Sequence, residues 1–260
     1  MAPSLSLVAG AGRSDGERRA LADGLSSRQA FILPPPAGAD VRHGAPRPDA
    51  PTLSEVFAGS ARDGGWTGFL LERIDPQRPL LWIQERMAIV EGGRVHPPGL
   101  GRAAAGLIHV EARDAGAVLW AMEEGLRCSG LGAVIGELWG DPNALDFTAT
   151  RRLAVAAERH GVTAWLVRLG GSANLSGARW RWRVASAPSA VNDLNPRAPG
   201  APRWAAELFR ARGHPPGRWV VGDEGPHASA ATDTAGAANS GDLAAAAGDR
   251  ALAAGGGACP

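Results

Sequence analysis

Short apolar runs alternate with amphipathic segments through the middle of the chain. The apolar runs suit strands that are buried on both faces of a sheet. They are residues 52–58, 79–84, 106–110, 133–138 and 162–169. Apolar residues at helical spacing predict helices over residues 67–74, 114–127 and 148–160. Strands that alternate with helices predict a mostly parallel sheet with helices on its faces.

The boundaries of the two longer helices can be placed from single residues. Asp114 is a good N-cap, and the apolar residues after it recur at helical spacing and share one face. They are Val118, Leu119, Met122 and Leu126. Gly161 ends the second long helix, since glycine readily adopts the conformation that follows a last helical turn. Cys128 follows the first of these helices and is expected to be a small buried residue.

The pattern changes after residue 169. Residues 170–177 form a polar, glycine-rich loop. Residues 179–184 then alternate arginine with tryptophan, so a strand there places arginines on one face and tryptophans on the other. Residues 203–211 and 217–221 flank a His-Pro-Pro-Gly turn and predict a hairpin. The expected fold is therefore α/β, with a mostly parallel sheet, flanking helices and an antiparallel hairpin at its C-terminal edge.

Composition divides the chain into three parts. Residues 1–51 are expected to form a flexible arm, with one weak helix at 15–30 and a proline-rich linker. Residues 52–221 carry the apolar pattern and form the expected domain. Residues 222–260 are rich in alanine and glycine and carry five acidic residues, which predicts a disordered acidic tail.

Charge is nearly balanced overall but unevenly distributed. All 27 basic residues are arginine, and the net charge of +1 gives no general argument for nucleic-acid or membrane binding. Between Arg168 and Arg218, nine arginines stand against only two acidic residues, which suggests a basic surface. No apolar run is long enough for a membrane span. The two cysteines suggest neither disulfides nor a metal site, so a cytoplasmic location is expected.

The segment after the first strand has the glycine spacing of a phosphate-binding loop. Gly59 and Gly64 stand five residues apart, as in G-x-x-x-x-G-K-[ST]. The next two positions should hold lysine and a hydroxyl residue, but they hold Gly65 and Trp66. The cation for the phosphates and the hydroxyl for Mg²⁺ are therefore missing. We interpret the loop as vestigial and expect no cofactor, with weak ATP binding as the open alternative.

The order of the elements resembles the core of RecA-like recombinase ATPases. Under that resemblance Glu137 stands where the Walker B strand ends, and Glu85 stands where such enzymes place a water-activating glutamate. The two carboxylates could hold a metal and activate water, or they could simply be polar ends of buried strands. The vestigial nucleotide site would comprise Gly59, Gly64, Gly65, Glu85 and Glu137.

Several stretches resemble a narrower group, the ImuA family of RecA-like accessory proteins of bacterial SOS mutagenesis. One is Gly-Glu-Leu-Trp-Gly-Asp-Pro, and the set comprises residues 136–142, 145–153, 181–184, 187–189 and 207–213. The resemblance spans roughly residues 52–221. It implies induction by DNA damage and a role in translesion synthesis. It also implies three partners, namely a polymerase-like protein of the ImuB type, an error-prone replicative-type polymerase, and RecA itself.

Arginines in the second half of the chain are candidates for contact with DNA or with a protein partner. They are Arg168, Arg179, Arg181, Arg183, Arg210 and Arg212. Alternating arginine and tryptophan could form a platform for single-stranded DNA, with arginine on phosphate and indole on the bases. Alternatively, the tryptophans face the core and only the arginines remain outside, where they are solvated or contact a partner.

The function that the sequence favours is that of a non-catalytic accessory protein in a translesion synthesis complex. It would act through protein contacts in the cytoplasm and associate with the nucleoid when induced. A weak RecA-type ATPase and a single-stranded DNA-binding module are the two alternatives.

Overall fold

The computed structural model describes residues 44–222. The helix predicted at 15–30 and nearly all of the tail predicted at 222–260 lie outside the described residues. The strands are β1 (Leu53–Ala58), β2 (Leu80–Glu85), β3 (Leu107–Ala112), β4 (Ala133–Trp139), β5 (Thr163–Leu169), β6 (Trp180–Ala187), β7 (Arg203–Ala211) and β8 (Gly217–Gly222). The helices are α2 (Gly65–Leu71), α3 (Arg86–Gly92), the 3₁₀ segment η1 (Pro97–Gly106), α4 (Ala115–Leu126) and α5 (Phe147–His160).

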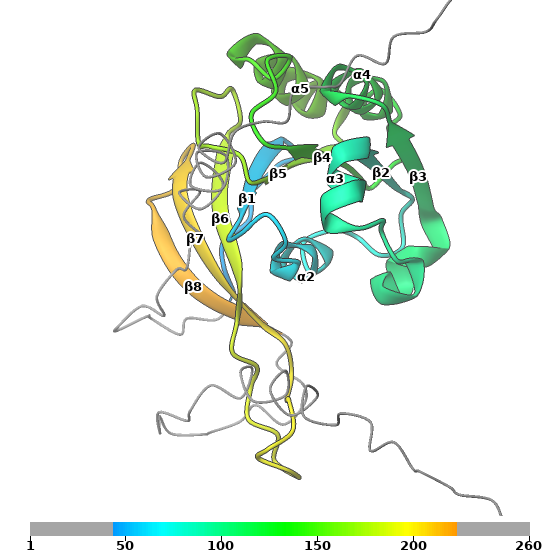
Figure 1. Cartoon of the computed structure of the whole chain (residues 1–260). Coiled ribbons are helices and arrows are strands. Elements are labelled where there is room, and N and C mark those ends of the chain that lie inside the picture. Colours follow the sequence, from blue (N-terminus) through cyan, green and yellow to red (C-terminus); the bar gives the residue numbers. More distant parts are fainter. Residues whose placement is uncertain (1–43, 223–260) are drawn as a thin grey trace, which may run out of the picture. The chain divides into compact units, whose positions relative to one another are not determined.

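The strands of the described region form one sheet in the order β3-β2-β4-β5-β1-β6-β7-β8 (Figure 1). Every pairing from β3 across to β6 is parallel. The pairings of β6 with β7 and of β7 with β8 are antiparallel. The expected fold class is therefore confirmed, including the hairpin at the C-terminal edge. Because the strands are parallel, β1, β2, β4 and β5 all end at the same edge of the sheet.

The core consists of two apolar clusters, one on each face of the sheet. Helix α2 covers the first, which is rich in aromatic residues, while α4 and α5 cover the second (Figure 1). Neighbours along β2 alternate between the two clusters, so Trp82 lies in the first and Ile83 in the second. Both side chains are at most 1% exposed. The sheet is thus buried on both faces, as the continuous apolar runs predicted.

The two long helices begin and end where the sequence indicated, within one or two residues. The Asp114 carboxylate accepts a hydrogen bond from the backbone N–H of Ala117 at 2.9 Å. Asp146 does the same for Ala149 at 2.7 Å and so caps the start of α5. Gly161 follows α5 in the left-handed region, with a φ of 68°, a conformation that other residues rarely adopt.

Some expectations need correction. The helix predicted at 67–74 is α2 and starts two residues earlier, directly at Gly65. Helix α3 and the 3₁₀ segment η1 were not predicted, because α3 has only seven residues and η1 is rich in proline, glycine and alanine. Cys128 is exposed, so the expectation that it is buried is wrong. Within residues 44–222 no helix has the length and apolar character needed to cross a membrane.

Candidate functional site

The glycine loop connects β1 to α2 and lies against β6. The backbone N–H of Gly59 donates to the Val184 carbonyl at 2.7 Å. A Cβ atom at Gly59 would lie only 2.5 Å from the Cβ of Ala185, closer than two carbon atoms can approach. Gly59 is therefore required by the packing of the loop against β6, whether or not a phosphate binds.

Gly65 occupies the position where a phosphate loop has its lysine. A Cβ atom there would lie 2.6 Å from the backbone nitrogen of Ser186 in β6. Any side chain at position 65 would displace β6 or α2, because its first atom meets backbone. Gly64 differs, since a Cβ atom there would have no neighbour within 4 Å. The close approach of β6 explains why the lysine position holds glycine rather than arginine.

The chain's own carboxylate occupies the loop. Asp63 Oδ1 accepts a hydrogen bond from the backbone N–H of Gly65 at 2.8 Å. The same carboxylate accepts from the backbone N–H of Ser186 at 2.9 Å and from its hydroxyl at 2.6 Å. Backbone N–H groups of such a loop normally hold phosphate oxygens. Here the backbone N–H of Gly65 donates to Asp63 instead, and the negative charge of Asp63 also repels a phosphate.

A cavity of about 230 Å³ lies beside the loop, at the edge where the parallel strands end. Ligands of α/β proteins bind at this edge. Trp66 and Trp82 supply aromatic surface to the cavity. The polar residues that line the cavity include Arg62, Asp63, Thr67, Gln84, His96 and Glu137. Thr67, one residue after the position where the motif has its hydroxyl residue, also lines this cavity.

Glu137 is the buried acid of the cavity, at 3% exposure. It accepts hydrogen bonds from the indole N–H of Trp82 and, at 3.0 Å, from the side-chain amide of Gln84. Burial raises the pKa of Glu137 to about 7, and the two hydrogen bonds oppose this rise. No cation lies within ion-pair distance of Glu137 among the described residues. Two uncharged hydrogen-bond donors, Trp82 and Gln84, therefore hold this carboxyl group in place.

Glu85 plays a different part from Glu137. Its Oε2 accepts a hydrogen bond from the backbone N–H of Trp139 at 2.8 Å, which ties the end of β2 to the end of β4. Glu85 does not line the cavity that contains Glu137. The two glutamates that the RecA-like resemblance pairs therefore do not face the same cavity.

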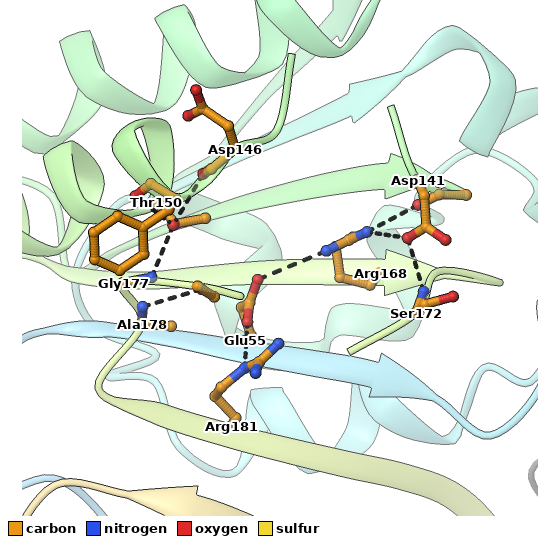
Figure 2. Close-up of polar contacts among 12 residues, drawn as sticks. Glu55, Asp141, Asp146, Thr150, Arg168, Ser172, Gly177, Ala178 and Arg181 are labelled. Atoms are coloured by element: carbon orange, nitrogen blue, oxygen red, sulfur yellow. Dashed lines mark hydrogen bonds and ion pairs between the residues drawn. The ribbon is translucent and has the colours of Figure 1, made fainter. Parts of the chain in front are cut away.

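Two of the candidate arginines are buried, and the expectation that they stand outside is wrong for both. Arg168 and Arg181 are each 4% exposed and flank Glu55 of β1 (Figure 2). Arg181 Nε donates to Glu55 Oε2 at 2.7 Å, and Arg168 Nη1 lies 3.7 Å from Oε1. Burial lowers the pKa of the Arg168 guanidinium, while Glu55 and Asp141 act to raise it. These arginines hold the sheet together and cannot reach a nucleic acid.

The sequence carries a signal for this network that we did not use. Glu55 lies in the middle of an apolar strand, and a buried carboxylate requires a cationic partner. Its partners were hidden because Arg181 is 126 residues further along the chain.

The glycine-rich loop after β5 is anchored at both ends (Figure 2). Asp141 accepts from Arg168 Nη2 at 2.6 Å and from the backbone N–H of Ser172 at 2.8 Å. At the other end the Thr150 hydroxyl accepts from the backbone N–H of Gly177 at 2.9 Å. Between these anchors Leu175 is 72% exposed. The loop therefore presents an apolar side chain from a fixed base.

The remaining candidate arginines lie nearer the surface, on two different parts of it. Arg183 pairs with Glu207 at 3.2 Å and lies over the ring of Phe209. Arg179, Arg210 and Arg212 line one groove, of about 570 Å³, beside α5. The structure thus brings together three of the six predicted arginines.

Two curated proteins are similar to this chain in sequence. No family model matches the chain. The chain is 35% identical over 164 residues to the protein ImuA of Caulobacter vibrioides, in two strains of that bacterium. The match covers 57% of this chain. The matched part of the chain is similar in sequence to these ImuA proteins. The resemblance to the ImuA family that the sequence indicated is thereby confirmed.

The chain spans less than two thirds of the length of these ImuA proteins, namely 63%. Among solved structures, its fold is similar to that of the RadB recombinase, with a TM-score of 0.46 and 15% sequence identity. That similarity covers 66% of this chain and 87% of the recombinase chain.

Proposed function

We propose that this protein is a non-catalytic accessory factor of SOS mutagenesis that acts through protein contacts in a translesion synthesis complex. The sequence similarity to ImuA proteins supports the role in SOS mutagenesis. The observation that carries the non-catalytic role is the filled glycine loop. Asp63 accepts the hydrogen bond of the Gly65 N–H group, which a phosphate would need. Strand β6 leaves no room for a side chain at position 65.

The chemistry of the cavity supports the same proposal. Phosphoryl transfer depends on cations that neutralise the phosphate oxygens and on a metal held by hydroxyl and carboxylate ligands. Gly65 supplies no cation, and Trp66 supplies no hydroxyl. Glu137 is buried and already accepts hydrogen bonds from Trp82 and Gln84. The scaffold of a nucleotide site is thus present without the cation and the hydroxyl at the two motif positions, although Arg62 and Thr67 line the cavity.

The partners in this proposal are those that the family resemblance implies. They are a polymerase-like protein of the ImuB type, an error-prone replicative-type polymerase, and RecA. The protein would be cytoplasmic and would associate with the nucleoid after DNA damage.

Titration with ATP and Mg²⁺ tests the non-catalytic role directly. Isothermal calorimetry of the purified protein should detect no binding tighter than the high micromolar range, because the loop lacks a charge-assisted contact of about 1.5–3 kcal/mol. Clear magnesium-dependent ATP turnover by the pure protein would contradict the proposal and favour the ATPase alternative.

Restoring the lysine should not restore a nucleotide site. We expect Gly65→Lys to lower the free energy of unfolding by about 1–3 kcal/mol, because its Cβ atom collides with the backbone of β6. It should leave ATP binding undetectable. The matched control is Gly64→Lys, where a Cβ atom meets nothing within 4 Å and the loss should be smaller. Urea unfolding measures the free energy of unfolding of both variants. Equal decreases would show that β6 does not exclude a side chain at position 65.

A cellular experiment tests the process. In cells that lack this protein, DNA damage should no longer raise the mutation frequency, and the wild-type gene should restore the response. Affinity purification from damaged cells, with and without residues 222–260, should recover the polymerase-like partner. Normal damage-induced mutagenesis in the deleted cells would refute the proposal.

A further inference from the structure

A groove lined by arginines runs between α5 and the ends of β6 and β7; we call it the basic groove. Its volume is about 570 Å³. Its lining residues include Phe147, Arg151 and Val155 of α5, Arg210 of β7, and Arg179 and Arg212, which adjoin β6 and β7. Phe147 and Arg151 lie within residues 145–153, one of the stretches that resemble the ImuA family.

The walls of the basic groove are held rigidly. Phe147, Arg151 and Val155 are spaced four residues apart on α5, so they lie on one face of the helix. The backbone N–H of Arg212 donates to the Arg179 carbonyl at 2.9 Å, which joins the two strand ends. Gly177 packs so closely that a Cβ atom there would lie 2.6 Å from the backbone of Arg151. A ligand would therefore meet a preformed surface.

The charge of the basic groove is largely uncompensated. Arg179 donates two hydrogen bonds to Glu158, at 2.7 and 3.2 Å. These bonds lower the pKa of Glu158, and Arg212 adds to the effect from further away. Within residues 44–222 no carboxylate lies within the 4.0 Å of an ion pair from Arg151, Arg210 or Arg212. Three guanidinium groups are thus available to an anionic ligand.

The groove also offers apolar surface, which bears on the kind of anion. Phe147 is 41% exposed and Val155 is 48% exposed, and both line the groove. Nearby, Leu175 projects from the anchored loop. Surfaces that combine arginine with exposed aromatic and aliphatic groups are typical of protein interfaces.

The features that a single-stranded nucleic acid would need are largely absent from this face. Binding of single strands relies on several aromatic side chains on which successive bases stack. Trp180 and Trp182 are at most 6% exposed and belong to the core. Phe147 is the one aromatic residue that lines the basic groove, among the described residues. The balance of charge and apolar surface therefore favours a peptide.

We propose that the basic groove binds an acidic peptide segment of a protein partner. The carboxylates of the peptide pair with Arg151, Arg210 and Arg212, and an apolar side chain packs against Phe147 and Val155. This inference rests on the proposed function, because it names the chemistry by which one of the protein contacts is made.

Selection from a random dodecapeptide library on phage, with the wild-type protein immobilised, tests the proposal. The enriched peptides should combine several aspartates or glutamates with a leucine or an aromatic residue. A fluorescein-labelled copy of the most enriched peptide should bind wild-type protein. Its affinity should fall at least about tenfold in Arg151→Glu/Arg212→Glu, because opposed charges become like charges in the groove.

The matched control is Arg86→Glu/Arg102→Glu, which changes the net charge equally at two exposed residues outside the groove. Its affinity for the peptide should change less than about twofold. Thermal melts of both variants check that they are folded. If the charge-reversed groove does not fold, Arg151→Gln/Arg212→Gln should still weaken binding.

Three results would overturn the inference. They are a selection without acidic enrichment, peptide binding that the groove variants do not weaken, and an oligothymidine that binds more tightly than the peptide through the same arginines.

Affinity purification of partners distinguishes this inference from the proposed function. If partners co-purify with both wild type and the groove variant, only the groove assignment fails. If wild-type protein recovers none, the proposed function itself fails.

Discussion

Replacing Glu55 by alanine should lower the free energy of unfolding by about 3–5 kcal/mol, because it leaves two buried guanidinium groups without their shared carboxylate. Glu55 has a side-chain exposure of 1% and lies between Arg168 and Arg181. A buried charge that loses its partner keeps its full desolvation cost. Chemical denaturation of wild type and Glu55→Ala measures the difference directly.

The control for this variant is an ion pair at the surface. Arg94 and Glu111 lie 2.7 Å apart, but their side chains are 55% and 42% exposed. Glu111→Ala should therefore cost less than about 1 kcal/mol, since water solvates the arginine that remains. Similar losses in the two variants would show that the Glu55 network contributes no more than an exposed pair.

The network also positions the anchored loop, so Glu55→Ala should have a second, local effect. Arg168 contacts Glu55 on one side and Asp141 on the other, and Asp141 holds the backbone N–H of Ser172. Loss of Glu55 should speed hydrogen exchange at Ser172 more than at Gly177, whose N–H is held by Thr150. If Glu55→Ala changed the exchange rates of Ser172 and Gly177 equally, the network around Glu55 would not position the loop.

The stability of the protein should fall as the pH rises through neutrality, and Glu137→Gln should remove most of that fall. The pKa of Glu137 is about 7 in the folded protein against an ordinary value of 4.5. The folded state therefore binds the proton more tightly than the unfolded state, and stability decreases with pH across this window. The contribution is fully present below pH 4.5 and is lost as the pH rises through about 7. The difference corresponds to about 3 kcal/mol.

The measurement is the free energy of unfolding of wild type and Glu137→Gln at several pH values on both sides of this window. The wild-type curve should fall relative to that of the variant, whose side chain does not titrate. His109 contacts Gln84 and is present in both proteins, so its own titration largely cancels in the comparison. Parallel curves would mean that Glu137 titrates in its ordinary range.

Most of the fold could be predicted because its signals are local. Apolar runs bounded by glycine and capping residues marked β2, β4, β5, α4 and α5, and the structure agrees within one or two residues. The segments that were missed have weak periodicity. Helix α3 has seven residues and buries only Ala88, so no apolar stripe marks it in the sequence.

The site was harder to predict, because its decisive contacts join distant parts of the chain. The glycine spacing located the loop. The role of Asp63 could not be seen in the sequence, because it also binds Ser186, which lies 123 residues away. The alternation of arginine and tryptophan in β6 was read correctly as two faces. The error was to assume that one face meets water. Arg181 instead packs over the rings of Phe57 and Phe209 and donates a hydrogen bond to Glu55.

The aspartate in the glycine loop bears on how such a protein can be regulated. A working phosphate-binding loop changes its contacts when a nucleotide binds, because its backbone N–H groups then hold the phosphate oxygens. Here Asp63 and β6 hold the loop in place with groups of the protein itself. Under the proposed function, the shape of the partner-binding surfaces does not depend on the ATP concentration in the cell. When and how often the complex forms then depends on how much of this protein is synthesised.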